Sequence, residues 1–334
     1  MTYSVYQHWD PLKVCIVGRS YSPEFYHFIK NDRARNVMER IARETEEDYQ
    51  KLITLLESFG VKILRPEVSD NYLDYLDLVT NRIQPPPMTP RDYTMMLGDT
   101  FFFKSNDYRL EWHNERGHDW PEFIPSSYDE FLKCADHVKP DVARFLRTRN
   151  ILPEFCTDMW ANVLRDISQH SKIVVQESAL VSNFNSALTT RIGKDIYVGT
   201  EYYAADITDQ VDNLRKVFPE YRWHKVDTGG HSDGVFCPVV PGLIVSLRDI
   251  KNYQETFPGW EVVYLPWQSW AKVYPFLQLK DKNGGKWWVP GEELNDDFTS
   301  FVEEWLGHWV GYVEETVFDV NMLVIDRHNV VCNN

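Results

Sequence analysis

The sequence predicts an α/β protein, and three observations support this class. Short runs of apolar, β-branched residues alternate with segments of helical periodicity. The order strand, strand, helix, strand occurs twice in succession in the second half, as in a repeat architecture. The 334 residues are 43% hydrophobic, so the chain can bury a full core. We therefore expect one α/β domain over residues 1–334.

The first third of the chain predicts a strand, a long helix and a second strand. Residues 12–18 form an apolar run that ends at glycine, and residues 61–64 form another. Between them, residues 34–59 carry an apolar stripe at helical spacing, and Gly60 suits the position after the last helical turn. A hairpin follows at residues 93–103, with its turn at Gly98-Asp99. Residues 104–177 are predicted to be mostly helical and loop-like.

The second half predicts two complete units and the start of a third. The expected strands are residues 185–190, 196–199, 222–226, 233–239, 243–246, 261–265, 318–325 and 329–332, with helices at 205–218 and 249–257. By this order the third unit lacks a helix and a last strand, so we expect strand 329–332 to have an open edge. The tryptophan-rich segment 266–316 is predicted to be an insertion that packs on a core of its own.

Charge and cysteine usage exclude several classes of protein. The chain has 35 basic and 50 acidic side chains, a net charge of −15, which opposes binding to nucleic acid. Its five cysteines are scattered without C-x-x-C spacing, which favours a reducing compartment over a disulfide framework. The N-terminus has no apolar signal core, and no run of about 18 apolar residues exists. We therefore expect a cytoplasmic protein without a membrane span.

Three polar clusters stand at predicted strand starts. They are Pro90-Arg91-Asp92, the segment 184–187 around Asn185, and the segment 229–234 around His231 and Asp233. Because residues i and i+2 of a strand share a face, His231 and Asp233 are expected to point into one cavity. Each cluster alone also fits a local hydrogen bond or a turn cap.

Guanidinium chemistry suits this set of side chains. Two carboxylates, Asp92 and Asp233, match the planar donors of a guanidinium, and His231 could move protons. Breaking a guanidinium C–N bond further requires a nucleophile such as a thiolate. No nucleotide-binding loop or metal-ligand spacing occurs, so no cofactor and no metal are expected.

In their order, these segments resemble the glycine amidinotransferase family. Residues 4–19, with Trp9-Asp10-Pro11-Leu12, are similar to the opening of that family, and residues 88–92 resemble its M-x-P-R-D segment. Further matching segments are 184–187, 191–196, 231–233, 241–246 and 320–325. The resemblance implies a pentein fold, a propeller of about five strand–strand–helix–strand units around a central funnel, incomplete here at the C-terminus.

The resemblance also implies roles for individual residues. His231 would be the general acid/base, and Asp92 and Asp233 would hold the guanidinium. Asn185 stands where the family carries the aspartate that orients the histidine; an amide supplies no charge there. Asp319 would add negative charge near the substrate.

Two of the family's expected residues are out of register or missing. Arg248 is the nearest candidate for the arginine that binds a substrate carboxylate, although it comes two residues early. The family's nucleophilic cysteine lies in a G-G-x-H-C segment past the strand at residues 329–332, and this sequence ends before it.

We therefore expect an amidinotransferase-like protein that acts on or binds a guanidino compound, with arginine as amidino donor and an amine as acceptor. Transfer would require the cysteine segment to be supplied elsewhere. The alternatives are an inactive guanidino-binding relative and a deiminase-type guanidine hydrolase. Expected partners are the small guanidino substrate and either a second copy of the chain or a complementing C-terminal polypeptide.

Overall fold

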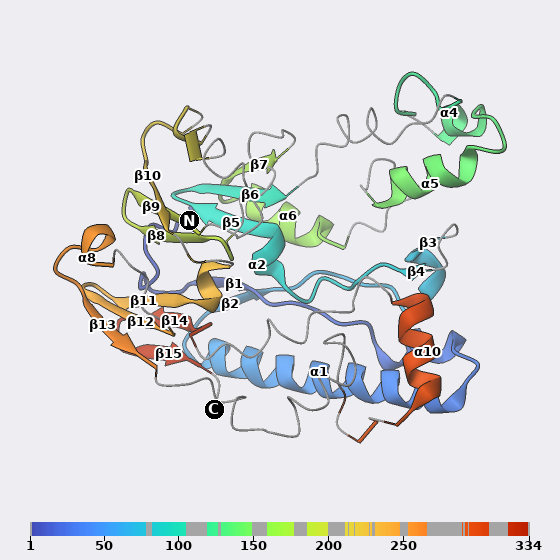
Figure 1. Ribbon diagram of the computed structural model, residues 1–334, viewed down its shortest axis with the longest axis horizontal. Coiled ribbons are helices and arrows are strands. Elements are labelled where there is room, and N and C mark those ends of the chain that lie inside the picture. The colour runs from blue at the N-terminus through green and yellow to red at the C-terminus, as the bar shows by residue number, and fades with distance from the viewer. Residues whose placement is uncertain are drawn as a thin grey trace.

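The computed structural model shows a row of small sheets beside one long helix (Figure 1). It describes residues 2–77, 82–104, 119–125, 128–148, 159–176, 186–199, 218–226, 231–247, 253–265, 294–306 and 320–332, together with residues 211, 212, 214–216, 228, 289, 291 and 292.

The long helix α1 (Asp32–Ser58) connects the first two strands, as the sequence predicts. Asn31 caps it, because its side chain accepts hydrogen bonds from the backbone of Arg33 and Ala34. Gly60 follows its end with φ 73°, a left-handed conformation that favours glycine. In the sequence the helix comes between β1 (Val14–Ile16) and β2 (Lys62–Leu64), and these two strands pair in parallel.

Three units follow, each with an antiparallel strand pair and then a parallel strand. In the first and third units described helices lie between the two parallel strands in the sequence, since a parallel connection needs a crossover. The units are β5 (Thr94–Leu97), β6 (Thr100–Lys104), α6 (Ala161–Ser168) and β7 (Lys172–Gln176); β8 (Thr189–Ile192), β9 (Asp195–Gly199) and β10 (Arg222–Val226); and β11 (Phe236–Val240), β12 (Leu243–Ser246), α8 (Tyr253–Thr256) and β13 (Glu261–Tyr264).

The last described strands, β14 (Leu323–Asp326) and β15 (Asn329–Val331), form an antiparallel hairpin. Among the strands that the structure describes, β15 pairs only with β14, and β1 only with β2. The N-terminal segment ties these sheets together. Val5 bridges to Gly98, Gln7 bridges to Ile192, and the Leu12 amide donates to the Ile325 carbonyl (2.8 Å).

The remaining described elements are short helices, turns and strands outside these sheets. They are the 3₁₀ turns η1 (Pro23–Phe28), η2 (Tyr72–Asp74) and η4 (Ser232–Gly234), the short strands β3 (Leu76–Asp77) and β4 (Arg82–Ile83), and the helices α2 (Pro90–Tyr93), α4 (Tyr128–Leu132), α5 (Lys139–Thr148) and α10 (Asp296–Trp305). No described helix is long and apolar enough to cross a membrane.

The sequence prediction did not include strand β7, which completes the first unit beside β6 in a segment predicted to be mostly helical and loop-like. One prediction about this part of the chain is wrong. The tryptophan-rich segment does not pack only on a core of its own. Its described helix α10 crosses α1 (Figure 1) and buries Phe298, Phe301 and Val302 in the core that α1 also enters. Most of the helix predicted at residues 205–218 and most of segment 266–316 lie outside the described residues.

Candidate functional site

The first cluster is placed by a close approach between two loops. Gly18 lies against the loop before α2, where a Cβ on Gly18 would stand 2.1 Å from the Met88 carbonyl oxygen. Pro90 opens α2, the position where its missing N–H costs nothing. Asp92 therefore lies on a short helix before β5, not on the extended chain leading into that strand. Arg91 and Asp92 are both partly exposed.

The sequence predicted that His231 and Asp233 share one face of a strand. In the structure they do not. Strand β11 begins only at Phe236, and residues 232–234 form the 3₁₀ turn η4. The Gly234 amide donates to the His231 carbonyl (3.2 Å) and the Val235 amide to the Ser232 carbonyl (3.0 Å), which closes the turn. A 3₁₀ turn has about three residues per turn, so residues two apart point in different directions.

The η4 turn is nonetheless fixed against the second cluster. The Ser232 hydroxyl donates to the Leu188 carbonyl (2.8 Å), and the Asp233 amide to the Ala187 carbonyl (3.3 Å). Ser186 in turn donates through its hydroxyl to the carbonyl of Thr94, at the start of β5 (2.7 Å). The described parts of the three polar clusters therefore lie close together near the starts of β5, β8 and β11.

Asp233 is engaged by an arginine of the chain itself. Arg91 Nη1 lies 3.1 Å from Asp233 Oδ2 and donates to Asn321 Oδ1 (3.0 Å). Asn321 Nδ2 donates to the same Asp233 oxygen (3.5 Å), which closes a ring of three side chains. The Asp233 side chain is only 9% exposed, so this pair is mostly shielded from water. Sequence reasoning assigned no role to Arg91 or Asn321. The only signals for them were the position of Arg91 beside Asp92 and the position of Asn321 in the matching segment 320–325.

The electrostatics of Asp233 reflect the same neighbours. Burial raises the pKa of the Asp233 carboxyl, and the negative charge of Asp92 acts in the same direction. The charges of Arg91 and His231 oppose the rise. Asp92 and His231 therefore each lie within electrostatic range of Asp233, although the predicted shared face is absent.

Three other predicted site residues lie outside the described part of the chain. They are Asn185, Arg248 and Asp319. Their expected roles beside the histidine, at a substrate carboxylate and near the substrate remain predictions.

None of the thiols with a shifted pKa is prepared for nucleophilic attack. Burial raises the pKa of Cys15 and of Cys237 to about 11, and burial also raises the pKa of Cys134. The charge of Arg91 lowers the pKa of Cys237 and the charge of Asp233 raises it, so Cys237 lies near the site. A nucleophilic cysteine instead needs a lowered pKa, because the thiolate is the reactive form.

A cavity of about 480 Å³ adjoins the site. Residues of β1, β5, β8 and β14 line it, together with Arg91 and the N-terminal segment. His8 and Arg191 also line this cavity. Burial, followed by the charges of Arg191 and Arg91, lowers the pKa of His8 well below its usual value, which keeps the ring neutral at pH 7.

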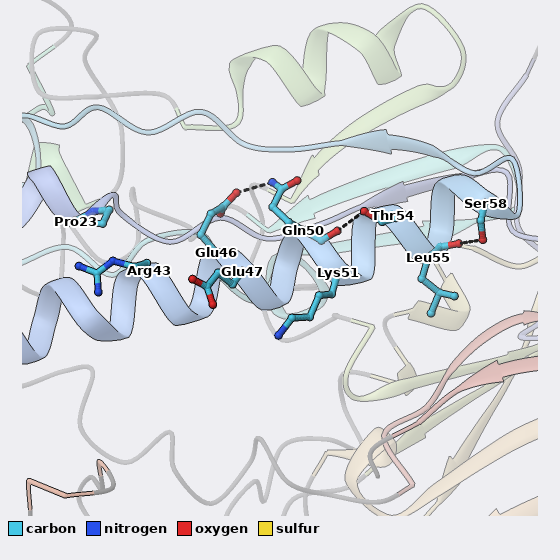
Figure 2. Close-up of a pocket in the computed structure, with 9 residues that line it drawn as sticks. All are labelled: Pro23, Arg43, Glu46, Glu47, Gln50, Lys51, Thr54, Leu55 and Ser58. Atoms are coloured by element: carbon cyan, nitrogen blue, oxygen red, sulfur yellow. Dashed lines mark hydrogen bonds between the residues drawn. The ribbon is translucent and has the colours of Figure 1, made fainter.

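A larger hollow, of about 990 Å³, follows the outer face of α1. Figure 2 shows that its side chains come mainly from successive turns of the helix and that several bond along it. Gln50 donates to Glu46 (2.6 Å), and Thr54 donates to the Gln50 carbonyl (2.8 Å). Because its polar groups do not converge on a common point, this hollow is not the candidate site.

Comparison with known proteins relates the chain to enzymes that act on amidino groups. No protein-family model matches it. The chain is 21% identical over 290 residues to the mitochondrial glycine amidinotransferase of Gallus gallus, and 23% identical over 291 residues to that of Xenopus tropicalis. Both alignments cover 78% of this chain and 65% of the relative, so the chain spans about two thirds of the length of these relatives.

The structural comparison concerns the fold. The inosamine-phosphate amidinotransferase of Streptomyces griseus superimposes with a TM-score of 0.53, over 99% of this chain and 84% of that one, at 15% identity. At this identity the match shows the fold alone.

Proposed function

Since this chain is a divergent relative of the glycine amidinotransferases, with their mixed α/β pentein fold, we propose that it binds a guanidino compound at Asp92, His231 and Asp233. The curated relatives are named for amidino transfer to glycine, and arginine is the donor that the sequence resemblance implies. We assign this chain the binding step first, because the described residues offer a site for the cation.

The observation that carries this proposal is the Arg91–Asp233 pair. A guanidinium already lies on Asp233, with Asn321 accepting from the same nitrogen. This pair supports the proposal, because it places a carboxylate and an amide oxygen within hydrogen-bond distance of one guanidinium nitrogen. A ligand's guanidinium would take the place of Arg91, and Asp92 supplies a second negative charge nearby.

His231 is the candidate proton donor and acceptor of the site. It stands at the start of η4, and its charge acts on Asp233. A histidine in this place could protonate the amine that leaves a guanidinium, or deprotonate an acceptor amine.

The reaction depends on a thiolate. Transfer needs a sulfur that attacks the central guanidinium carbon, releases the amine, and passes the amidino group to an acceptor amine. The raised pKa values of Cys15 and Cys237 disfavour both as that nucleophile. We therefore propose transfer with a cysteine from outside the described residues, supplied by a complementing polypeptide.

A binding protein without turnover is the second candidate, and the same raised thiol pKa values favour it. A hydrolase of the deiminase type is distinguished by its products, since it would release citrulline or urea instead of a new guanidine.

We also propose that the repeat units belong to a pentein propeller around the cavity. Strands of four sheets line that cavity, as the first strands of a propeller would. Residues 1–334 would form one such domain, with a tryptophan-rich insertion at residues 266–316. The cytoplasmic location stays a prediction, and the curated relatives are named as mitochondrial proteins.

Calorimetric titration with L-arginine and with guanidinium tests the binding proposal. We expect saturable binding that Asp233→Asn abolishes. The matched control is Asp297→Asn, because Asp297 also pairs with an arginine (Arg33, 3.1 Å) but on the surface. Absence of binding by the unaltered chain, or equal loss in both variants, would refute the proposal. Product analysis with arginine and an amine then separates transfer, hydrolysis and simple binding.

A further inference from the structure

We propose that the cavity lined by His8, Arg91 and Arg191 binds a small oxyanion, a carboxylate or a phosphate, separately from the guanidino ligand. The cavity encloses about 480 Å³, within the usual range for small-molecule sites.

Arg191 is the centre of this site. Its side chain leaves β8, and its Nη1 donates to the Met96 carbonyl on the neighbouring unit. Its Nε has no hydrogen-bond partner, and among the described residues no carboxylate lies within ion-pair distance of it. A buried guanidinium normally pairs with an anion, since an uncompensated charge is costly to remove from water. Burial and the charge of Arg91 lower the pKa of Arg191 to about 10, as expected where counter-charge is lacking.

The nearest acidic side chain does not fill this role. Asp10 lines the same cavity, and its charge acts on Arg191 in the stabilising direction. Its Oδ2, however, accepts from the backbone amides of Tyr6 (3.0 Å) and Gln7 (2.9 Å), which hold the N-terminal turn. The Asp10 carboxylate is therefore already hydrogen-bonded to backbone amides.

His8 supplies a second unused polar atom. Its Nε2 is buried and has no hydrogen-bond partner within the described structure. A neutral imidazole can carry its proton on that nitrogen and donate it to an anion. Ser186 and Thr189 also line the cavity. The charged side chains along its wall are three basic ones, Lys13, Arg91 and Arg191, against Asp10, in a chain whose net charge is −15.

The ligand class follows from these donors. Arginine nitrogens and an imidazole N–H match the oxygens of a carboxylate or phosphate. The proposal is independent of guanidinium binding at Asp233, because the oxyanion is tested alone and Arg191 does not contact Asp233 in the described structure.

Calorimetry and thermal unfolding with inorganic phosphate and, separately, acetate test the site. We expect one of the two to bind saturably and to raise the Tm with concentration, because a ligand of the folded state stabilises it. Arg191→Gln should weaken binding on the order of 10- to 100-fold, the loss of a charge-assisted hydrogen bond. Arg191→Lys should weaken it less. Arg222→Gln, which removes an exposed arginine paired with Asp195, should leave it unchanged.

A crystal of the unaltered chain grown with selenate keeps the test independent of whether Arg191→Gln folds. Selenate is a tetrahedral oxyanion whose selenium can be located by anomalous scattering. We expect selenium between Arg191 and His8. Absence of selenium there, or equal oxyanion affinity in the unaltered chain and Arg191→Gln, would overturn the proposal, whatever arginine does at Asp233.

Discussion

Arg91 and Asp233 form an ion pair, 3.1 Å apart, between a loop helix of one unit and a 3₁₀ turn of another. Arg91 is thus bound to the Asp233 carboxylate, with which the guanidinium of a ligand would have to pair. Binding of such a ligand should require Arg91 to move away, and this competition sets the first prediction.

Arg91→Gln should bind guanidinium more tightly than the unaltered chain at pH 8. The substitution removes the internal competitor and one positive charge, so the affinity should rise by roughly tenfold, about 1.4 kcal/mol. Calorimetric titration measures it. Arg33→Gln, which removes the surface partner of Asp297, is the control and should change nothing. Weaker binding by Arg91→Gln would mean that Arg91 supports the ligand instead of competing with it.

Guanidinium binding should weaken on acidification at a higher pH than an ordinary aspartate would cause. The pKa of Asp233 is raised by burial, so this carboxyl takes up its proton earlier as the pH falls and then cannot pair with a cation. The stability of the fold depends on pH in the opposite direction. The contribution of the Asp233 carboxyl to the free energy of unfolding is fully present below the pKa of an unfolded aspartate, about 3.9. This contribution is lost as the pH rises through the raised pKa of the folded state.

Titration between pH 4 and 8, in buffers of different ionisation enthalpy, checks this prediction. We expect proton release on ligand binding near the acidic end of the range. Binding that is constant across the range, with no proton release, would contradict a raised pKa at the binding carboxylate.

Arg65→Ala should destabilise the fold by about 2–3 kcal/mol. The Arg65 side chain is 10% exposed, pairs with both oxygens of Glu46 on α1 (2.7 and 2.9 Å) and donates to the Gly18 carbonyl (2.8 Å). Arg65 lowers the pKa of Glu46, so this stability is present above the unfolded pKa of a glutamate, about 4.3, and is lost as the pH falls through the lowered folded value.

Urea unfolding at pH 7 measures the effect of Arg65→Ala. Lys51→Ala is the control, because the Lys51–Asp48 pair on the same helix is exposed and should contribute nothing measurable. Equal stability of both variants would show that the buried contacts of Arg65 do not fix α1.

Gly18→Ala should disturb the candidate site as well as the fold. The added Cβ would meet the backbone of Met88, so the loop that carries Arg91 and Asp92 must shift. We expect a loss on the order of 1–3 kcal/mol in stability and weaker guanidinium binding. Gly193→Ala is the matched control, since nothing lies within 4 Å of its Cβ and only its φ of 64° is strained, a cost of about 1–2 kcal/mol. Full guanidinium affinity in Gly18→Ala would contradict this account of the loop.

Helical periodicity and turn residues predicted much of the fold. The apolar stripe and Gly60 located α1, and the glycine turns located the hairpins of β5–β6, β8–β9 and β11–β12. Strand β7 was missed because its apolar run, Ile173-Val174-Val175, lies in a long segment without other strand signals. A parallel partner such as β6 is distant in sequence and leaves no local pattern.

The candidate site was predicted in part. Asp92, His231 and Asp233 were identified from their residue types and order, and the structure brings their segments together. Their geometry was not predicted, because hydrogen bonds between successive residues turn 231–235 away from the extended conformation. Arg91 stands next to Asp92 in the sequence, yet its partner Asp233 is far along the chain, so their pairing follows only from tertiary placement.

Crystallisation of the chain with L-arginine tests the central claim most directly. The account predicts that the ligand's guanidinium lies on Asp233 and Asn321, with Arg91 displaced from its position 3.1 Å from Asp233 Oδ2. An unchanged Arg91–Asp233 pair at saturating arginine, with no ligand near Asp92, would contradict it.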